Sequence, residues 1–227
     1  MKFFPFAVII LFIILLPIYI HAEKHGGFKK ATTIKLILSG LCSVCALLGF
    51  ALGGTNFDCL NILVVLALVC ALFGDYFLQF IRLDAKKFNI GIICFALTQI
   101  FLIIYLIARH GISWQEFVMT AVIAVGVLIL MVKQKWQLGS AQAPLSVYTV
   151  LLAFMTSKAI LALFSSNGIT LSVILMAAGA ALFLLSDLLL GIWNYNTGKR
   201  IHANMNWITY FCAILLIALS ISPLPGL

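Results

Sequence analysis

Two aspartates stand inside apolar segments of this sequence, where a carboxylate is costly. Asp75 lies in ALFGDYFLQF and Asp187 lies in FLLSDLLLGI. The remaining acids belong to loops or to the ends of apolar segments: Glu23, Asp58, Asp84 and Glu116. An aspartate at the centre of a membrane helix costs about 2.5–3.5 kcal/mol on insertion scales. Two such residues indicate a functional site, with structural hydrogen bonding between helices as the alternative.

Other polar side chains are expected at a similar depth, and together they predict a polar cavity that opens toward the cytoplasmic leaflet. Helical spacing puts Gln79 one turn after Asp75 and Asn194 two turns after Asp187. Ser39 shares this level, and Gln99 is expected nearer the middle of the membrane. The candidate substrate-binding residues are Lys35, Gln79, Gln99, Tyr148, Asn194 and Tyr210.

The composition requires membrane-spanning helices to position these residues. The 227-residue chain is 64% hydrophobic and 9% charged, with a mean hydropathy of +1.21. Apolar runs of about 18 or more residues are typical of transmembrane helices, and the alternating polarity of a β-barrel is missing from the sequence. We predict an all-α, polytopic eight-helix bundle in a single domain, residues 1–227. The expected spans are 3–21, 32–53, 59–81, 89–108, 116–132, 145–164, 169–193 and 206–222.

Basic residues alternate from loop to loop. The odd-numbered loops hold Lys24, Lys29, Lys30, Arg82, Lys86, Lys87, Lys133, Lys135, Lys199 and Arg200, whereas the opposite side holds Lys2 and Arg109. Short loops rich in Lys and Arg stay in the cytoplasm. The predicted topology in the cell membrane therefore has the odd-numbered loops in the cytoplasm and both termini outside. This distribution accounts for the net charge of +8 without a nucleic-acid partner.

Two features near these spans leave alternatives open. The first span follows Lys2 and resembles a signal peptide, but its cleavage would leave Lys24 and its basic neighbours outside, so we expect it to be retained. TIKLIL (33–38) resembles TSKAIL (156–161), and FGDYFL (73–78) resembles LSDLLL (185–190). Two parallel four-helix repeats explain this order, and chance explains it equally well. Lys158, inside the sixth span, is expected to extend its ammonium group to the outer interface.

The sequence predicts no metal and no cofactor. All four histidines fall at span ends or in loops, away from both aspartates, and His21 and His25 lack an evident third ligand. Cys42 and Cys45 form CSVC within a membrane helix, where they are expected to pack as small apolar residues. Phosphate-loop and dinucleotide fingerprints are missing from the sequence.

Four segments in this order resemble the YhhN-like lysoplasmalogenase family of eight-helix membrane proteins. TTIKLILSGL resembles its Lys-Pro segment, ALFGDYFLQF its Gly-Asp motif, FLLSDLLLGI its Ser-Asp motif, and NWITYFCAILLIALS its closing Tyr-rich helix. The sequence departs from the family pattern at Leu36, which replaces the proline, at Gln99, which replaces a histidine, and at Ile214, which replaces a polar residue.

The resemblance implies hydrolysis of the vinyl ether bond of a lysoplasmalogen-type lysolipid, which gives a fatty aldehyde and a glycerophospho-headgroup. Asp75 and Asp187 are then the acid–base pair, one protonated as general acid and the other ionised. Which aspartate has which role is left open. Lys35 is the expected contact of the substrate phosphate.

Two other functions compete with hydrolysis. Buried aspartates also relay protons, so a small-molecule or proton-coupled transporter is the main alternative. The prolines lie outside the middle of the second to eighth spans, which disfavours a carrier built on broken helices. The other alternative is a membrane assembly factor without catalytic activity, in which the two aspartates serve folding alone.

Overall fold

Eight long helices make up the computed structural model, which describes residues 4–25, 27–51, 58–80, 83–136, 138, 142–165 and 169–222. They are α1 (Phe4–His25), α2 (Gly27–Ala51), α3 (Asn61–Leu78), α4 (Ala85–His110), α5 (Trp114–Lys133), α6 (Gln142–Leu161), α7 (Leu171–Ile192) and α8 (Arg200–Leu219). A short 3-10 turn, η3 (Ala162–Phe164), follows α6, and one π-helical turn, η4 (Trp193–Thr197), follows α7. The described residues contain no strand, and all eight helices are long and apolar enough to cross a membrane. The predicted eight-helix, multi-pass bundle is confirmed.

The helices differ from the expected spans mainly at the end of the bundle that carries the basic loops. There α2 begins at Gly27 and α8 at Arg200, before the expected 32 and 206. Hydropathy marks only the residues that suit lipid, whereas the backbone hydrogen bonds of a helix continue into polar sequence. The first turns of α8 therefore carry polar residues that hydropathy alone leaves outside the membrane span.

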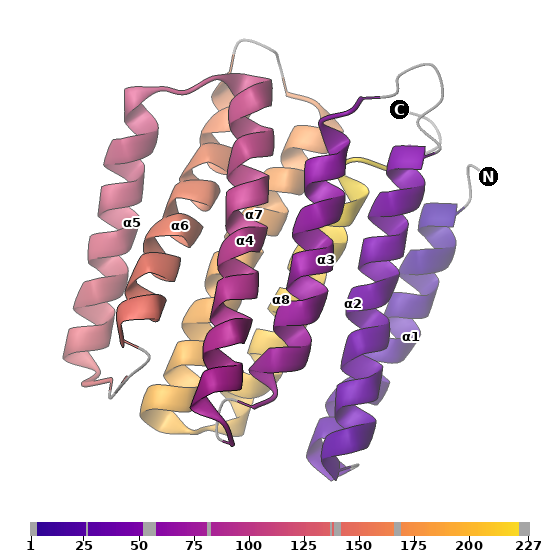
Figure 1. The fold of residues 1–227 in the computed structure, drawn as a ribbon, viewed down its shortest axis with the longest axis vertical. Helices are drawn as coiled ribbons and strands as arrows, with labels where there is room; N and C mark the ends of the chain where they lie inside the picture. The colour runs from indigo at the N-terminus through magenta and orange to yellow at the C-terminus, as the bar shows by residue number, and fades with distance from the viewer. Residues whose placement is uncertain are drawn as a thin grey trace.

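Six of the helices close a ring, and two pack outside it (Figure 1). Contacts join α2 to α3, α3 to α4, α4 to α6, α6 to α7, α7 to α8, and α8 back to α2. Helix α1 packs on α2 and α8, and α5 packs on α6, so these two helices form opposite edges of the bundle. They are correspondingly less buried. Of an apolar 18-residue stretch in each helix, 22% of the residues are buried in α1 and 17% in α5, against 39–50% in the other six. Both aspartates lie on helices of the ring, as do the candidate binding residues Lys35, Gln99, Tyr148 and Tyr210.

Glycines allow the closest helix pairs of the ring to form. A Cβ atom on Gly91 of α4 would lie 3.2 Å from the backbone nitrogen of Leu78 on α3. A Cβ atom on Gly179 of α7 would lie 2.8 Å from Ile217 and 3.0 Å from the carbonyl oxygen of Ala213, both on α8. Small residues let membrane helices approach closely enough for dispersion contacts along their length. The α3–α4 and α7–α8 pairs thus provide the frame that holds the two aspartates.

The loops that carry the basic residues meet at one end of the bundle. The end of α1 and start of α2, the α3–α4 and α5–α6 connections, and the α7–α8 connection all lie at the bottom of Figure 1, opposite the N- and C-termini. We call this the basic end. Of the charges that define the predicted topology, Lys2 and Arg82 lie outside the described residues. The assignment of the basic end to the cytoplasm stays a prediction.

Candidate active site

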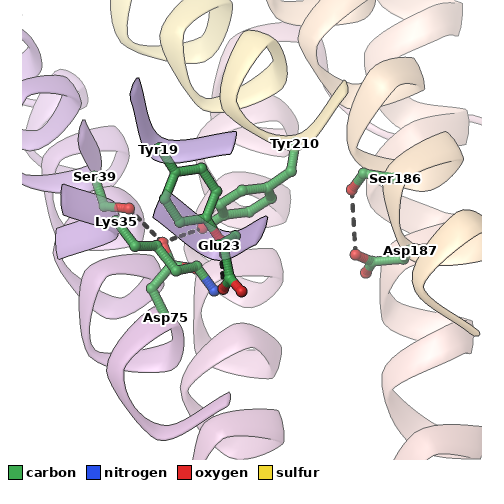
Figure 2. A network of polar contacts seen from close by, with 8 residues as sticks. All are labelled: Tyr19, Glu23, Lys35, Ser39, Asp75, Ser186, Asp187 and Tyr210. Atoms are coloured by element: carbon green, nitrogen blue, oxygen red, sulfur yellow. Dashed lines mark hydrogen bonds and ion pairs between the residues drawn. The ribbon is translucent and has the colours of Figure 1, made fainter. Parts of the chain in front are cut away.

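Asp75 of α3 is enclosed by three donor side chains from two other helices, α2 and α8. Its carboxylate is 0% exposed, and its Oδ1 lies 3.0 Å from the Nζ of Lys35, which is itself 6% exposed. Oδ2 accepts hydrogen bonds from the hydroxyl of Ser39 and, at 2.6 Å, from the hydroxyl of Tyr210. Lys35 and Ser39 are one turn apart on α2, so both reach the same carboxylate. Figure 2 shows this cluster around Asp75.

Aromatic packing fixes the position of Tyr210. Its ring meets Phe183 of α7 edge to face at a centroid distance of 5.6 Å, and meets Phe95 of α4 at 6.1 Å. Gly74, the residue before Asp75, makes room for Phe95, because a Cβ atom there would lie 2.8 Å from the Phe95 ring. The small residue before the aspartate therefore has a packing role in the site.

Asp187 lies in a different environment on α7. The hydroxyl of Tyr148 donates to its Oδ2, and the Nε2 of Gln99 lies 3.5 Å from that same hydroxyl. The hydroxyl of Ser186 is 2.8 Å from the carbonyl oxygen of Phe183 and 3.3 Å from Oδ1 of Asp187. No salt bridge to Asp187 is found among the described residues. The contrast with Asp75, which is paired with an ammonium group, bears on their protonation.

The two carboxyl groups line one cavity from opposite sides. The cavity has a volume of about 100 Å³, and its polar lining includes Lys35, Tyr148 and Tyr210 as well as both aspartates. Figure 2 shows the Asp75 cluster on one side and Ser186 and Asp187 on the other. The rest of the lining is mostly apolar, with Ile92, Leu152 and Leu184 among its members. A polar centre beside an apolar wall suits an amphiphile.

A second cavity of about 350 Å³ adjoins the first at the basic end of the bundle. The two share Lys35, Leu78, Leu190, Asn206 and Trp207 in their linings. We call the second cavity the vestibule. Its other polar residues come from α1, from the residue after α3, and from η4: Tyr19, Glu23, Gln79 and Asn194. A ligand that extends from the inner cavity toward the basic end would enter the vestibule.

The predicted site residues fall into three groups in the structure. Asp75, Asp187, Lys35, Tyr148 and Tyr210 line the inner cavity. Gln79 and Asn194 line the vestibule, and Asn194 also donates to the carbonyl oxygen of Leu190. Gln99 is 0% exposed and lies behind Tyr148, outside both linings. Gln99 was expected to bind substrate, but its amide group is instead placed to position Tyr148.

Asn206 and Trp207 line both cavities but were not among the predicted site residues. Asn206 is 6% exposed, and its Nδ2 donates to the carbonyl oxygen of Ser186 at 2.7 Å, which ties α8 to α7 beside Asp187. It lies one turn before Tyr210 on α8, on the same helix face. That spacing is the signal in the sequence that points to it.

The expectation for Lys158 was wrong. Its side chain is 2% exposed instead of reaching the outer interface, and its Nζ lies 2.6 Å from Oε1 of Glu116. Glu116 was assigned to the end of its span, which it occupies in the first turn of α5, but it is also only 2% exposed. A buried ammonium needs a buried partner, and here α5 supplies it. Lys158 and Lys35, equivalent in the suggested repeat, therefore pair with acids from different elements.

Metal-ligand clusters are missing from the described residues. No group of three or more His, Cys, Asp or Glu side chains could hold an ion there. Cys42 and Cys45 are free thiols buried in the core, as expected of small apolar residues. The chemistry available to the site is that of two carboxyl groups, one ammonium group and two phenols.

The YhhN family is shown by its sequence profile, which matches residues 35–221 of the 227-residue chain. The chain therefore belongs to the YhhN family, as its motifs indicate. The match includes both aspartates and begins at Lys35 itself, whereas α1 and the start of α2 lie outside it. No curated protein and no solved structure matches the chain.

Proposed function

We propose that this member of the YhhN family is a membrane hydrolase that cleaves the vinyl ether bond of lysoplasmalogen-type lysolipids. The observation that carries this proposal is that Asp75 and Asp187 line the same cavity, together with mostly apolar residues. The resemblance described above implies the substrate class. The products are a fatty aldehyde and a glycerophospho-headgroup, and the reaction needs only water and proton transfer.

The ion pair and hydrogen bonds around Asp75 support the ionised role for this residue. Its neighbours are the ammonium group of Lys35, 3.0 Å from Oδ1, and the hydroxyls of Ser39 and Tyr210, which both donate to Oδ2. Opposite charge and hydrogen bonds to the charged form both favour a carboxylate. Asp75 and Lys35 thus form a neutral ion pair inside the bundle.

The lack of a salt bridge to Asp187 among the described residues supports the protonated role for this residue. The single proton of Ser186 lies closer to the carbonyl oxygen of Phe183, at 2.8 Å, which can only accept. The Ser186 oxygen, 3.3 Å from Oδ1, is then free to accept a proton from Asp187. Without a paired cation, a carboxyl group in an apolar setting favours its neutral form. Asp187 is therefore the general acid.

The proposed reaction begins with proton transfer to carbon. Asp187 protonates the outer carbon of the vinyl ether, and the positive charge that forms on the ether-bearing carbon is stabilised by the Asp75 carboxylate. Water adds to this carbon and gives a proton to Tyr210, whose own proton moves to Asp75. Tyr210 is placed for this relay because it lines the cavity and its hydroxyl donates to Asp75 at 2.6 Å.

Collapse of the resulting hemiacetal restores the site. Asp75 returns its proton through Tyr210 to the departing glycerol oxygen, and the hemiacetal hydroxyl gives its proton to Asp187. The carbon–oxygen bond to glycerol breaks as the aldehyde carbonyl forms. Both aspartates regain their starting states, so no other reactant is required.

Aldehyde release from a lysoplasmalogen by the purified protein in detergent micelles tests this proposal. We expect release by the wild type and its loss in Asp187→Asn, which keeps the shape of the side chain. Asp75→Asn leaves Lys35 without its partner, so the double variant Asp75→Asn/Lys35→Met is measured beside it, with thermal melts as the folding control. A folded wild type that releases no aldehyde from any lysoplasmalogen headgroup would overturn the proposal and favour transport.

A further inference from the structure

We propose that the vestibule binds the ammonium group of a zwitterionic lysolipid headgroup, with Glu23 as its counter-charge. The inference rests on the proposed function in one respect, namely that a lysolipid occupies the inner cavity. It adds a binding site on α1, a helix that lies outside residues 35–221 and is not needed for the acid–base chemistry.

Glu23 supplies the negative charge of the vestibule. The hydroxyl of Tyr19, one turn earlier on α1, donates to its Oε1 at 3.2 Å, and Tyr19 itself is 0% exposed. Glu23 makes no salt bridge among the described residues. A phenol anchored in the core therefore orients a carboxylate that has no salt-bridge partner among the described residues, on the wall of a cavity large enough for a small group.

Three aromatic side chains line the vestibule together with Glu23. Tyr19 packs edge to face on Trp207 at a centroid distance of 5.5 Å, and Trp207 packs in the same way on Trp193 at 5.9 Å. Tyr19, Trp193 and Trp207 all line the vestibule. Aromatic rings attract cations, and sites for alkylated ammonium groups combine such rings with a carboxylate. The Arg200 guanidinium, 5.0 Å from the Trp207 ring centroid, already makes this kind of contact.

The charges follow an order that complements a zwitterion. The Lys35 ammonium group lies where the two cavities meet, and Glu23 lies only two residues from the end of α1 at the basic end. Figure 2 shows Glu23 and Tyr19 beside the Lys35–Asp75 pair. A lysolipid with its ether in the inner cavity would present its phosphate to Lys35 and its ammonium group to Glu23. Both ends of the headgroup thus meet a charge of opposite sign.

Binding of saturated ether lipids tests this site without relying on catalysis. The two probes are a short-chain alkyl ether lysophosphocholine and the matching alkyl ether lysophosphatidic acid, which lacks the ammonium group. Neither carries a vinyl ether, so the proposed chemistry cannot consume them. Isothermal titration of the full chain in detergent gives the two dissociation constants. We expect Glu23→Gln to weaken binding of the ammonium lipid about tenfold and to leave the other lipid unchanged.

Two further variants make the result specific. Tyr19→Phe, which frees the Glu23 carboxylate, should weaken ammonium-lipid binding in the same direction by a smaller factor. Asp84→Asn is the matched control, because it removes one negative charge at the basic end from a residue outside both linings and keeps a good helix N-cap. It should change neither constant.

Two results would overturn the site. One is a wild type that binds both lipids with equal affinity, and the other is a Glu23→Gln variant in which both dissociation constants rise by the same factor. Failure of the hydrolase proposal has a different signature. It is the lack of aldehyde release from vinyl ether substrates, which leaves the two dissociation constants intact.

Discussion

The Lys35–Asp75 pair combines two charges that neither residue could keep alone in the bundle. Their side chains are 8% and 1% exposed, and the carboxylate receives two further hydrogen bonds. Burial of an isolated charge costs far more than burial of a pair. The pair is therefore a condition of folding as well as the proposed source of the negative charge in the site.

Removal of the ammonium group alone should be costly. We expect Lys35→Met to lower the free energy of unfolding by about 3–5 kcal/mol, because it leaves a buried carboxylate with no cation. Lys35→Met/Asp75→Asn should recover most of the loss, since an apolar and an amide side chain need no counter-charge. Titration with SDS in mixed micelles measures both. Additive losses in the double variant would contradict the coupling.

Tyr210 offers a sharper test of the proton relay. Tyr210→Phe keeps the ring packing on Phe95 and Phe183 but removes the hydroxyl that donates to Asp75. We expect kcat for aldehyde release to fall by about 10²–10⁴, the usual range for loss of a proton-transfer group, with KM little changed. A fall in kcat/KM that comes entirely from a higher KM, with kcat unchanged, would indicate that Tyr210 binds substrate and moves no proton.

The expected depth in the membrane singled out some of these residues, but the partner of each polar side chain can be identified only from the structure. Lys35, Tyr148 and Tyr210, which were expected at the level of the aspartates, line one cavity with them. The same reasoning failed for Lys158, because depth does not reveal that Glu116 on a neighbouring helix lies 2.6 Å away. Asn206 was missed because it is the first residue of the expected span 206–222, whereas α8 begins earlier, at Arg200, and places it well inside the helix.

At the scale of elements, α5 is the helix with the least support. It packs on α6 at the edge of the bundle, and only 17% of the residues in its apolar 18-residue stretch are buried. Its first turn contributes Glu116, which binds Lys158 of α6, while Ser113 donates to the same Glu116 oxygen at 3.2 Å. Oε2 of Glu116 is buried without a hydrogen-bond partner among the described residues. The ion pair thus joins a peripheral helix to the ring.

Breaking this pair should loosen α5 without changing the chemistry. We expect Lys158→Met to destabilise the protein by about 3–5 kcal/mol and Lys158→Met/Glu116→Gln by clearly less. The control is Arg109→Met at the Arg109–Asp58 pair, whose side chains are 35% and 30% exposed, where a loss of about 1 kcal/mol or less is expected. SDS titration and aldehyde release are measured on each. Full loss of activity in the folded Lys158→Met variant would place this pair in the catalytic machinery.

Element number and order were within reach of the sequence, because eight apolar runs separated by short charged loops have one simple interpretation. The ring was not. Contact between α4 and α6, which leaves α5 outside, depends on side-chain shape over the whole length of both helices. The close approach at Gly91 and Gly179 is likewise visible only when the facing helix is known.

At the scale of the whole molecule, charge asymmetry and the site point in the same direction. The basic loops gather at the end where the vestibule lies, and both cavities share Lys35 there. If the basic end faces the cytoplasm, the proposed substrate enters from the cytoplasmic leaflet and its headgroup meets the vestibule first. The orientation of the bundle in the membrane therefore decides which lipid pool the protein can reach.

Cys59 provides a native probe of this orientation. It is exposed and lies just before α3, at the end of the bundle opposite the basic loops. Because short basic loops stay in the cytoplasm, we expect a membrane-impermeant maleimide to label Cys59 in intact cells. Cys59→Ser should abolish that labelling. Lys133→Cys in the Cys59→Ser background places a thiol at the basic end, and it should react only after permeabilisation. The reverse pattern would place the vestibule outside the cell, and the substrate would then have to come from the outer leaflet.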